Sequence, residues 1–167
     1  DCALKLPQTA TLLNIQYRMH ATIMAFSNMF FYKNQLQADS SIADHSLAFD
    51  DNQWNSPLVF VDTSGCGFEE WQHPETLSYK NTEEAKILGI HLKACDEAAA
   101  HRPYSEKLRV GVLTPYRQQR QQLLEDLKPI TFEHLRVEVK TIDGFQGDEC
   151  DIIYISLVRN NTSGELG

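Results

Sequence analysis

The stretch that decides the fold reads TIDGFQGDECD at residues 141–151 and continues as IIYISLVR at residues 152–159. The first part is a polar loop that contains Gly144 and Gly147, and the second is an apolar run rich in β-branched residues. A run that is apolar on both faces suits a parallel strand covered on both sides. In open α/β sheets ligands bind at the carboxyl ends of strands, and glycines let the backbone approach a ligand closely. We therefore predict an α/β fold with a ligand loop here, against the alternative of a solvated turn.

Hydrophobic periodicity predicts that strands alternate with helices along most of the chain. One helix is predicted to start at Asn81, which can cap it while Glu84 reaches back as in a capping box. Strands that alternate with helices imply crossover connections and a mostly parallel sheet. The predicted helices are residues 18–32, a helix from Asn81 with the apolar stripe Ala85, Leu88, Leu92, Cys95 and Ala99, and a helix with Leu123, Leu124 and Leu127 that ends before Pro129; the predicted strands are 57–61, 108–113, 135–140 and 152–158.

The length of 167 residues is that of one domain. We expect three parts within it: an inter-domain segment with a motif helix at residues 1–33, a polar excursion at residues 34–56, and the sheet core at residues 57–167. The first and last residues, Asp1 and Gly167, look like cuts into a longer polypeptide, so we expect a truncated domain.

The net charge of −8 argues against a broad basic surface for nucleic acid, but it leaves room for a local cationic groove. Four cysteines without paired spacing argue against a disulfide framework and suit a reducing, cytoplasmic location. No run is long enough to span a bilayer, so no membrane partner is expected. The basic residues gather at Arg102, Lys107, Arg109, Arg117, Arg120 and Lys128.

Three motifs occur in a fixed order along the chain: QYRMH at residues 16–20, TPY at 114–116, and IDGFQGDECD at 142–151. In this order they resemble the superfamily 1 helicases of the up-frameshift, senataxin and immunoglobulin-mu-binding-protein group. The resemblance implies a RecA-like fold of the P-loop NTPase type, and it identifies this chain as the second RecA-like domain of an ATP-dependent helicase. It further implies ATP and Mg²⁺ as cofactors, single-stranded DNA or RNA as a partner, and the first RecA-like domain of the same polypeptide as a second partner.

The resemblance also implies roles at the nucleotide. Arg18 would reach the γ-phosphate, where a planar guanidinium suits phosphate oxygens, and Tyr17 would stack on the adenine. Gly147 and Glu149 would face the nucleotide, so that Arg18 and Glu149 are the candidate catalytic residues. The alternatives are an arginine that pairs with a carboxylate and a tyrosine that packs in the core. Gln16 is expected to support the backbone rather than touch a ligand.

By the same resemblance Thr114, Pro115, Tyr116 and Thr141 would lie along the nucleic-acid strand. Hydroxyl groups can donate to phosphates, and an aromatic ring can stack on a base. The alternative for residues 114–116 is a plain strand-to-helix turn with a packed tyrosine.

No Gly-x-x-x-x-Gly-Lys-[Ser/Thr] segment occurs in the sequence, so the phosphates and Mg²⁺ would be held mainly by the first RecA-like domain. We therefore expect this chain alone to be inactive, with no metal site of its own. A different class of protein remains as the alternative: a non-catalytic nucleic-acid-binding module with a helicase-like fold. Two rival sites are a nuclease site at Glu138 and Lys140, and a zinc site at His91 and Cys95 with Cys66 or His73.

Overall fold

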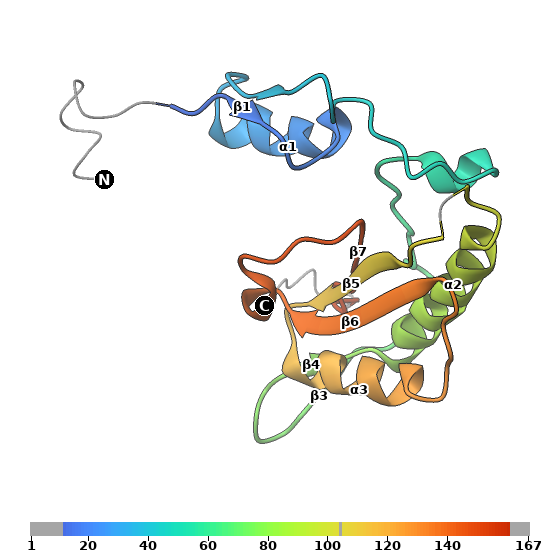
Figure 1. The fold of residues 1–167 in the computed structure, drawn as a ribbon. Coiled ribbons are helices and arrows are strands. Elements are labelled where there is room, and N and C mark those ends of the chain that lie inside the picture. The colour runs from blue at the N-terminus through green and yellow to red at the C-terminus, as the bar shows by residue number, and fades with distance from the viewer. Residues whose placement is uncertain (1–11, 104, 161–167) are drawn as a thin grey trace. The chain divides into compact units, whose positions relative to one another are not determined.

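The computed structural model of the protein describes residues 12–103 and 105–160 (Figure 1). The chain divides into two compact units. The first contains residues 1–47 and 55–60, and the second contains residues 48–54 and 61–167. We describe each unit by itself.

The first unit has one helix and a pair of short parallel strands. Strand β1 (Ile15–Gln16) pairs with β2 (Gln37–Ala38), and helix α1 (Ala21–Phe31) lies between them in sequence. The predicted helix at residues 18–32 therefore exists but starts three residues later. The His20 side chain caps it, because its Nδ1 accepts a hydrogen bond from the Thr22 amide at 3.0 Å. The short 3-10 helix η2 (Asn52–Asn55) belongs to the second unit except for its last residue.

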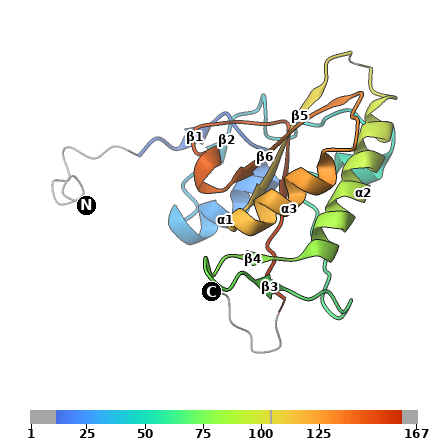
Figure 2. The same ribbon diagram turned by 90° about the horizontal axis from the view of Figure 1, so that it is seen from below.

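The second unit is built on a three-stranded parallel sheet in the order β6 (Leu135–Thr141), β5 (Leu108–Thr114), β7 (Ile152–Ile155) (Figures 1 and 2). Helices α2 (Thr82–Ala99) and α3 (Arg117–Leu127) pack against each other and against this sheet. The short strands β3 (Trp71–Gln72) and β4 (Tyr79–Lys80) form an antiparallel pair. A 3-10 turn, η3 (Asp143–Phe145), follows β6. The prediction of a parallel sheet flanked by helices is confirmed.

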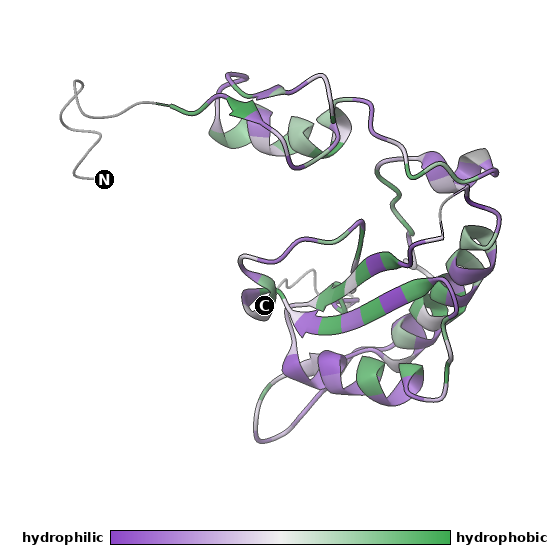
Figure 3. Cartoon of the chain, in the orientation of Figure 1, coloured by the Kyte–Doolittle hydropathy of each residue, from purple (hydrophilic) through white to green (hydrophobic). Residues whose placement is uncertain are grey.

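The core lies between α2, α3 and one face of the sheet. The predicted apolar stripe of α2 is buried at every position, as are Val110 and Val112 of β5. From Leu135 to Val139, buried or half-buried apolar side chains alternate with exposed charged ones, as predicted, and Figure 3 shows the alternation of apolar and polar residues. Hydrophobic burial of this kind provides most of the stability of a small domain.

The start of α2 confirms half of the predicted capping box. The Asn81 side chain accepts a hydrogen bond from the Glu84 amide at 3.0 Å. Glu84 does not reach back, because its carboxylate accepts hydrogen bonds from Ser156 Oγ at 2.7 Å and from the Val158 amide at 3.0 Å. The Asn81 amide instead donates to Gln119 Oε1 at 2.8 Å.

One strand prediction was wrong and another was wrong in part. Residues 57–61 form no strand, and Leu58 and Phe60 are 64% and 79% exposed. A strand needs a neighbour for its backbone groups, and no strand in the described ranges pairs with this run. Strand β7 is shorter than predicted and covered on one face only, so that Ile153 and Ile155 are exposed.

Within the described residues, no helix has the length and apolar character that a membrane crossing requires.

Candidate functional site

The loop that carries Tyr17 and Arg18 is held by the side chain of Gln16. Its Oε1 accepts hydrogen bonds from the Arg18 amide at 2.9 Å and the Met19 amide at 3.0 Å. Its Nε2 donates to the Met19 carbonyl at 2.8 Å. The supporting role predicted for Gln16 is thus confirmed, and the loop is fixed between β1 and α1.

Fixing the loop in this way presents the ring of Tyr17 to solvent. Tyr17 is 66% exposed, which is unusual for a large ring without a ligand. The amide and hydroxyl of Ser41, and then the hydroxyl of Tyr17, donate to Asp39 and hold the pKa of this carboxyl below its usual value. The ring is therefore tethered at its hydroxyl end and open for stacking elsewhere.

In the second unit, the register of the sheet brings together two of the residues that were predicted to contact nucleic acid. Thr114 at the end of β5 lies beside Thr141 at the end of β6, and the Ile142 amide donates to the Thr114 carbonyl at 3.1 Å. The TPY segment and the loop at residues 141–151, which we call the late loop, therefore leave the same edge of the sheet. This is the edge where ligands bind in open α/β sheets.

The three residues of the TPY segment have different surroundings. Thr114 is fully buried, and its Oγ1 accepts a long hydrogen bond of 3.4 Å from the Tyr116 amide. Pro115 is exposed. Tyr116 is half-buried, with its ring edge-on to Tyr79 at a centroid distance of 5.4 Å, and it bonds the guanidinium of Arg159. In this conformation Thr114 supports the segment, while Pro115 and part of Tyr116 form its surface.

The late loop presents Gly147 and Glu149 to solvent. Gly147 has a φ of +94°, a backbone conformation that favours glycine, and no atom lies near the position of an added Cβ. The Glu149 side chain is 60% exposed, with Oε1 at 3.8 Å from Arg109 Nη2. Asp151 braces the loop, because its carboxylate accepts a 2.7 Å hydrogen bond from the Arg109 amide.

One residue that positions the late loop was not predicted. A Cβ added to Gly111, in the middle of β5, would lie 3.3 Å from both Cys150 Sγ and the Phe145 ring. The loop therefore packs directly on the backbone of the central strand. A glycine inside a strand often marks such a close approach, and this signal could have identified it from the sequence.

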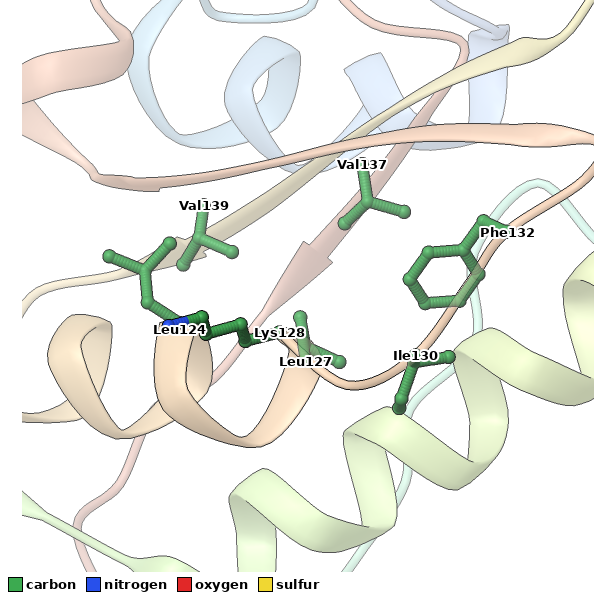
Figure 4. Close-up of a pocket in the computed structure, with 7 residues that line it drawn as sticks. All are labelled: Leu124, Leu127, Lys128, Ile130, Phe132, Val137 and Val139. Atoms are coloured by element: carbon green, nitrogen blue, oxygen red, sulfur yellow. The ribbon is translucent and has the colours of Figure 1, made fainter.

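Two hollows lie along α3 and β6. The first, of about 490 Å³, is an apolar groove (Figure 4). The second, of about 600 Å³, is lined by three cationic side chains among other residues, and we call it the basic hollow. The apolar groove is lined by Leu124, Leu127, Lys128, Ile130, Phe132, Val137 and Val139, and the basic hollow by Arg117, Arg120, Gln121, Leu124, Lys140, Thr141 and Gly144.

The residues of the alternative nuclease site and of the alternative zinc site make contacts within the domain. Lys140 Nζ lies 2.6 Å from Asp148 and 3.2 Å from Glu138, and these carboxylates raise the pKa of Lys140. This ion-paired cluster accounts for the Glu138 and Lys140 pattern. His91 Nδ1 hydrogen-bonds the Tyr154 hydroxyl at 2.8 Å, and Cys95 is fully buried. Among the residues the structure describes, no three potential ligands are grouped closely enough to hold a metal ion.

The family follows from comparison with known proteins. The profile of a family described as AAA domain matches residues 2–167. This chain belongs to the AAA domain family. The parallel sheet and flanking helices of the AAA domain agree with a RecA-like helicase fold.

Several proteins similar to this chain are named as helicases or DNA-binding proteins. The chain is 32% identical to DNA-binding protein SMUBP-2 of Mesocricetus auratus, over 93% of this chain and 16% of the relative. It is 34% identical to DNA polymerase alpha-associated DNA helicase A of Saccharomyces cerevisiae, over 93% of this chain and 24% of the relative. It is 35% identical to an uncharacterized ATP-dependent helicase of Methanocaldococcus jannaschii, over 97% of this chain and 24% of the relative. This chain is therefore a superfamily 1 helicase domain, and it spans a quarter or less of the length of each of these relatives.

Proposed function

We propose that this chain is the second RecA-like domain of an ATP-dependent helicase of the up-frameshift, senataxin and immunoglobulin-mu-binding-protein group. In this role it completes an ATP site that the first RecA-like domain holds, and it contacts single-stranded DNA or RNA. The register of β5 and β6 carries the proposal, because it places Thr114 beside Thr141. The TPY segment and the late loop, which we assign to ligand binding, therefore leave the sheet side by side at the carboxyl ends of β5 and β6.

Four residues, two from each unit, are assigned to the nucleotide, and each has surroundings that suit this role. Tyr17 offers an exposed ring on a braced loop for the adenine, and Arg18 follows it directly. Gly147 offers open space at the backbone, and Glu149 offers an exposed carboxylate. Nothing in the sequence resembles a P-loop, so these residues complement a phosphate cradle rather than form one.

Each residue then has a defined task. Bound ATP with Mg²⁺ supplies the phosphoryl group that is transferred to water. Arg18 stabilises the charge that develops on the γ-phosphoryl oxygens, as arginines delivered across a cleft do in other NTPases. Glu149 accepts hydrogen bonds from the ribose or the catalytic water, and Tyr17 fixes the base. Mg²⁺ would be held mainly by the first RecA-like domain.

The surface that contacts the single-stranded nucleic acid is formed by Pro115, Tyr116 and Thr141. The buried Thr114 supports this surface through its hydrogen bond from the Tyr116 amide. Stacking on Tyr116 and phosphate bonding by Thr141 are indifferent to sequence and serve DNA and RNA equally.

Arg18→Ala in the full-length protein tests this assignment. Loss of an arginine of this kind should lower kcat for ATP hydrolysis by about 10³-fold or more, since such arginines contribute 10³–10⁵ in rate. The Kd for a single strand should remain within about threefold, because Arg18 is assigned no strand contact. Arg136→Ala is the matched control, since Arg136 is an exposed arginine on β6 with no assigned role.

If Arg18→Ala lowered strand binding and hydrolysis equally, or if the control did the same, the assignment would be wrong. If the full-length protein bound single-stranded nucleic acid but hydrolysed no ATP, a non-catalytic binding module would be favoured instead.

A further inference from the structure

The basic hollow is electrically unlike the rest of the chain. Its lining contains three cationic side chains, Arg117, Arg120 and Lys140, and no carboxylate. The chain as a whole carries a net charge of −8. A hollow with this lining concentrates positive potential where the domain is otherwise acidic.

The three cations are not equivalent. Lys140 is paired with Asp148 and Glu138, so its charge is largely compensated. Within the described part of the chain, the Arg117 side chain makes no ion pair and no hydrogen bond. Arg120 donates from Nε to the Val139 carbonyl at 3.2 Å, a contact that leaves its charge uncompensated. The two arginines therefore supply the positive potential of the hollow.

The hydrogen bond of Arg120 also fixes where its guanidinium lies. It ties the side chain from α3 to the end of β6, one residue before Lys140 and two before Thr141. Arg117 lies three residues earlier on α3, so both arginines share a helix face. A guanidinium whose position is already fixed loses less entropy when it bonds a ligand.

The remaining polar groups suit an anion with several oxygens. Thr141 Oγ1 accepts a hydrogen bond from the Gly144 amide at 3.2 Å and keeps its own O–H to donate. Together with two arginines this provides donors from both sides of the hollow. Planar guanidinium groups and hydroxyls are the donors that most often bond phosphate oxygens in nucleic-acid complexes.

We infer that the basic hollow binds a backbone phosphate of the single strand, held by Arg117, Arg120 and the Thr141 hydroxyl. The inference rests on the proposed function, because Thr141 lines the hollow and also belongs to the proposed strand contact. The strand therefore continues from the TPY segment across the end of β6 and onto α3. Both nucleotides and nucleic acids carry phosphates. We assign the hollow to a backbone phosphate of the single-stranded nucleic acid, not to a phosphate of ATP.

Salt dependence of binding is the direct test, since each phosphate contact to a single strand contributes about 0.7 to the slope of log Kd against log salt concentration. The full-length protein is titrated with labelled oligo(dT) and oligo(U) at several salt concentrations. The variants are Arg117→Gln, Arg120→Gln and the double variant. Lys128→Gln, at the far end of the same helix, is the matched control, because it removes one charge outside the hollow.

The double variant should raise Kd by about 10-fold at low salt and reduce the slope by about 0.7, equally for DNA and RNA. Replacing both arginines by lysine should keep most of the slope, and Lys128→Gln should leave it unchanged. ATP affinity measured without a strand should not change. An unchanged slope in the double variant, or a loss of ATP affinity in its place, would overturn the inference.

Tyr116→Ala and Thr141→Ala, measured in the same titration, separate this inference from the proposed function. If they weaken strand binding and the arginine variants do not, the hollow is not a phosphate site and the proposed function stands. If neither pair weakens binding, the proposed strand contact itself is wrong.

Discussion

A single amide side chain organises the most exposed part of the candidate nucleotide site. Gln16 uses both its oxygen and its nitrogen to bond the backbone at Arg18 and Met19, and so Tyr17 is left pointing into solvent. The side chain of Asn81 performs a similar task at the start of α2. Local hydrogen bonds of this kind depend on residues close in sequence, so they could be anticipated from the sequence.

Replacing Tyr17 by alanine in the full-length protein should mainly weaken ATP binding. Base–aromatic stacking contributes about 1–3 kcal/mol in other complexes, so KM for ATP should rise about 5-fold or more while kcat changes little. Tyr17→Phe keeps the ring and should retain a KM near that of the parent protein. Steady-state kinetics measures both constants, and an unchanged KM in Tyr17→Ala would remove the stacking role.

Gly147→Ala should impair hydrolysis through the backbone. At a φ of +94° a Cβ is strained by about 1–2 kcal/mol, although nothing lies near it. Gly65 has a φ of +76° and equally open surroundings in another loop, so Gly65→Ala is a matched control for strain alone.

Both glycine variants should lower the free energy of unfolding similarly, as measured by urea denaturation. Only Gly147→Ala should slow ATP hydrolysis in the full-length protein. Equal activity of the two variants would mean that the conformation of Gly147 does not matter for the site.

Helices and strands with a clear period were predicted correctly, and those that depend on distant neighbours were not. The apolar stripe of α2 and the alternation along β6 follow from the spacing of residues on one segment. Whether residues 57–61 form a strand, and whether both faces of β7 are covered, depends on which other segments pair or pack with them. Spacing along one segment carries no such information. The same holds for Glu84, whose partners Ser156 and Val158 lie more than 70 positions away.

The packing of α2 and α3 on β7 depends on a buried polar network centred on Gln119. Its Nε2 donates to the Asn81 carbonyl at 3.1 Å and to Ser156 Oγ at 3.0 Å, and Gln119 itself is fully buried. Gln119→Ala should therefore destabilise the domain by about 1–3 kcal/mol, because it leaves buried polar partners unsatisfied.

Gln121→Ala, on an exposed position of the same helix, should change the free energy of unfolding by less than about 0.5 kcal/mol. Urea denaturation of both variants measures the difference. Similar values for the two would show that the network contributes nothing beyond surface hydrogen bonding.

At the scale of the whole molecule, positive side chains gather locally although the chain is acidic. The net charge is −8, yet the basic hollow gathers two arginines and a lysine at the end of β6. Its arginines were visible in the sequence as part of a basic cluster. Their common hollow was not, because it depends on how α3 lies against β6.

Stability of the second unit should fall in mild acid because of His91. Burial lowers the pKa of His91 below its ordinary value of 6.5, so the unfolded chain takes up the proton at a higher pH than the folded chain. The contribution of His91 is therefore complete above pH 6.5 and is lost as the pH falls through the lower folded pKa. Urea denaturation at pH 7.5 and 5.5 should show this loss.

In His91→Phe the difference between these two pH values should shrink, because the ring beside Trp54 no longer titrates. His101→Gln, an exposed control, should keep the pH dependence of the parent chain. An equally steep dependence in His91→Phe would show that other groups control acid stability.

The most direct measurement is a structure of the full-length protein with a non-hydrolysable ATP analogue, Mg²⁺ and a single strand. We predict that the Arg18 guanidinium lies within hydrogen-bonding distance, about 3 Å, of a γ-phosphate oxygen, with Glu149 in the same nucleotide groove. A guanidinium turned away from the triphosphate, or a Glu149 carboxylate outside that groove, would contradict the assignment of this chain as the second half of the ATP site.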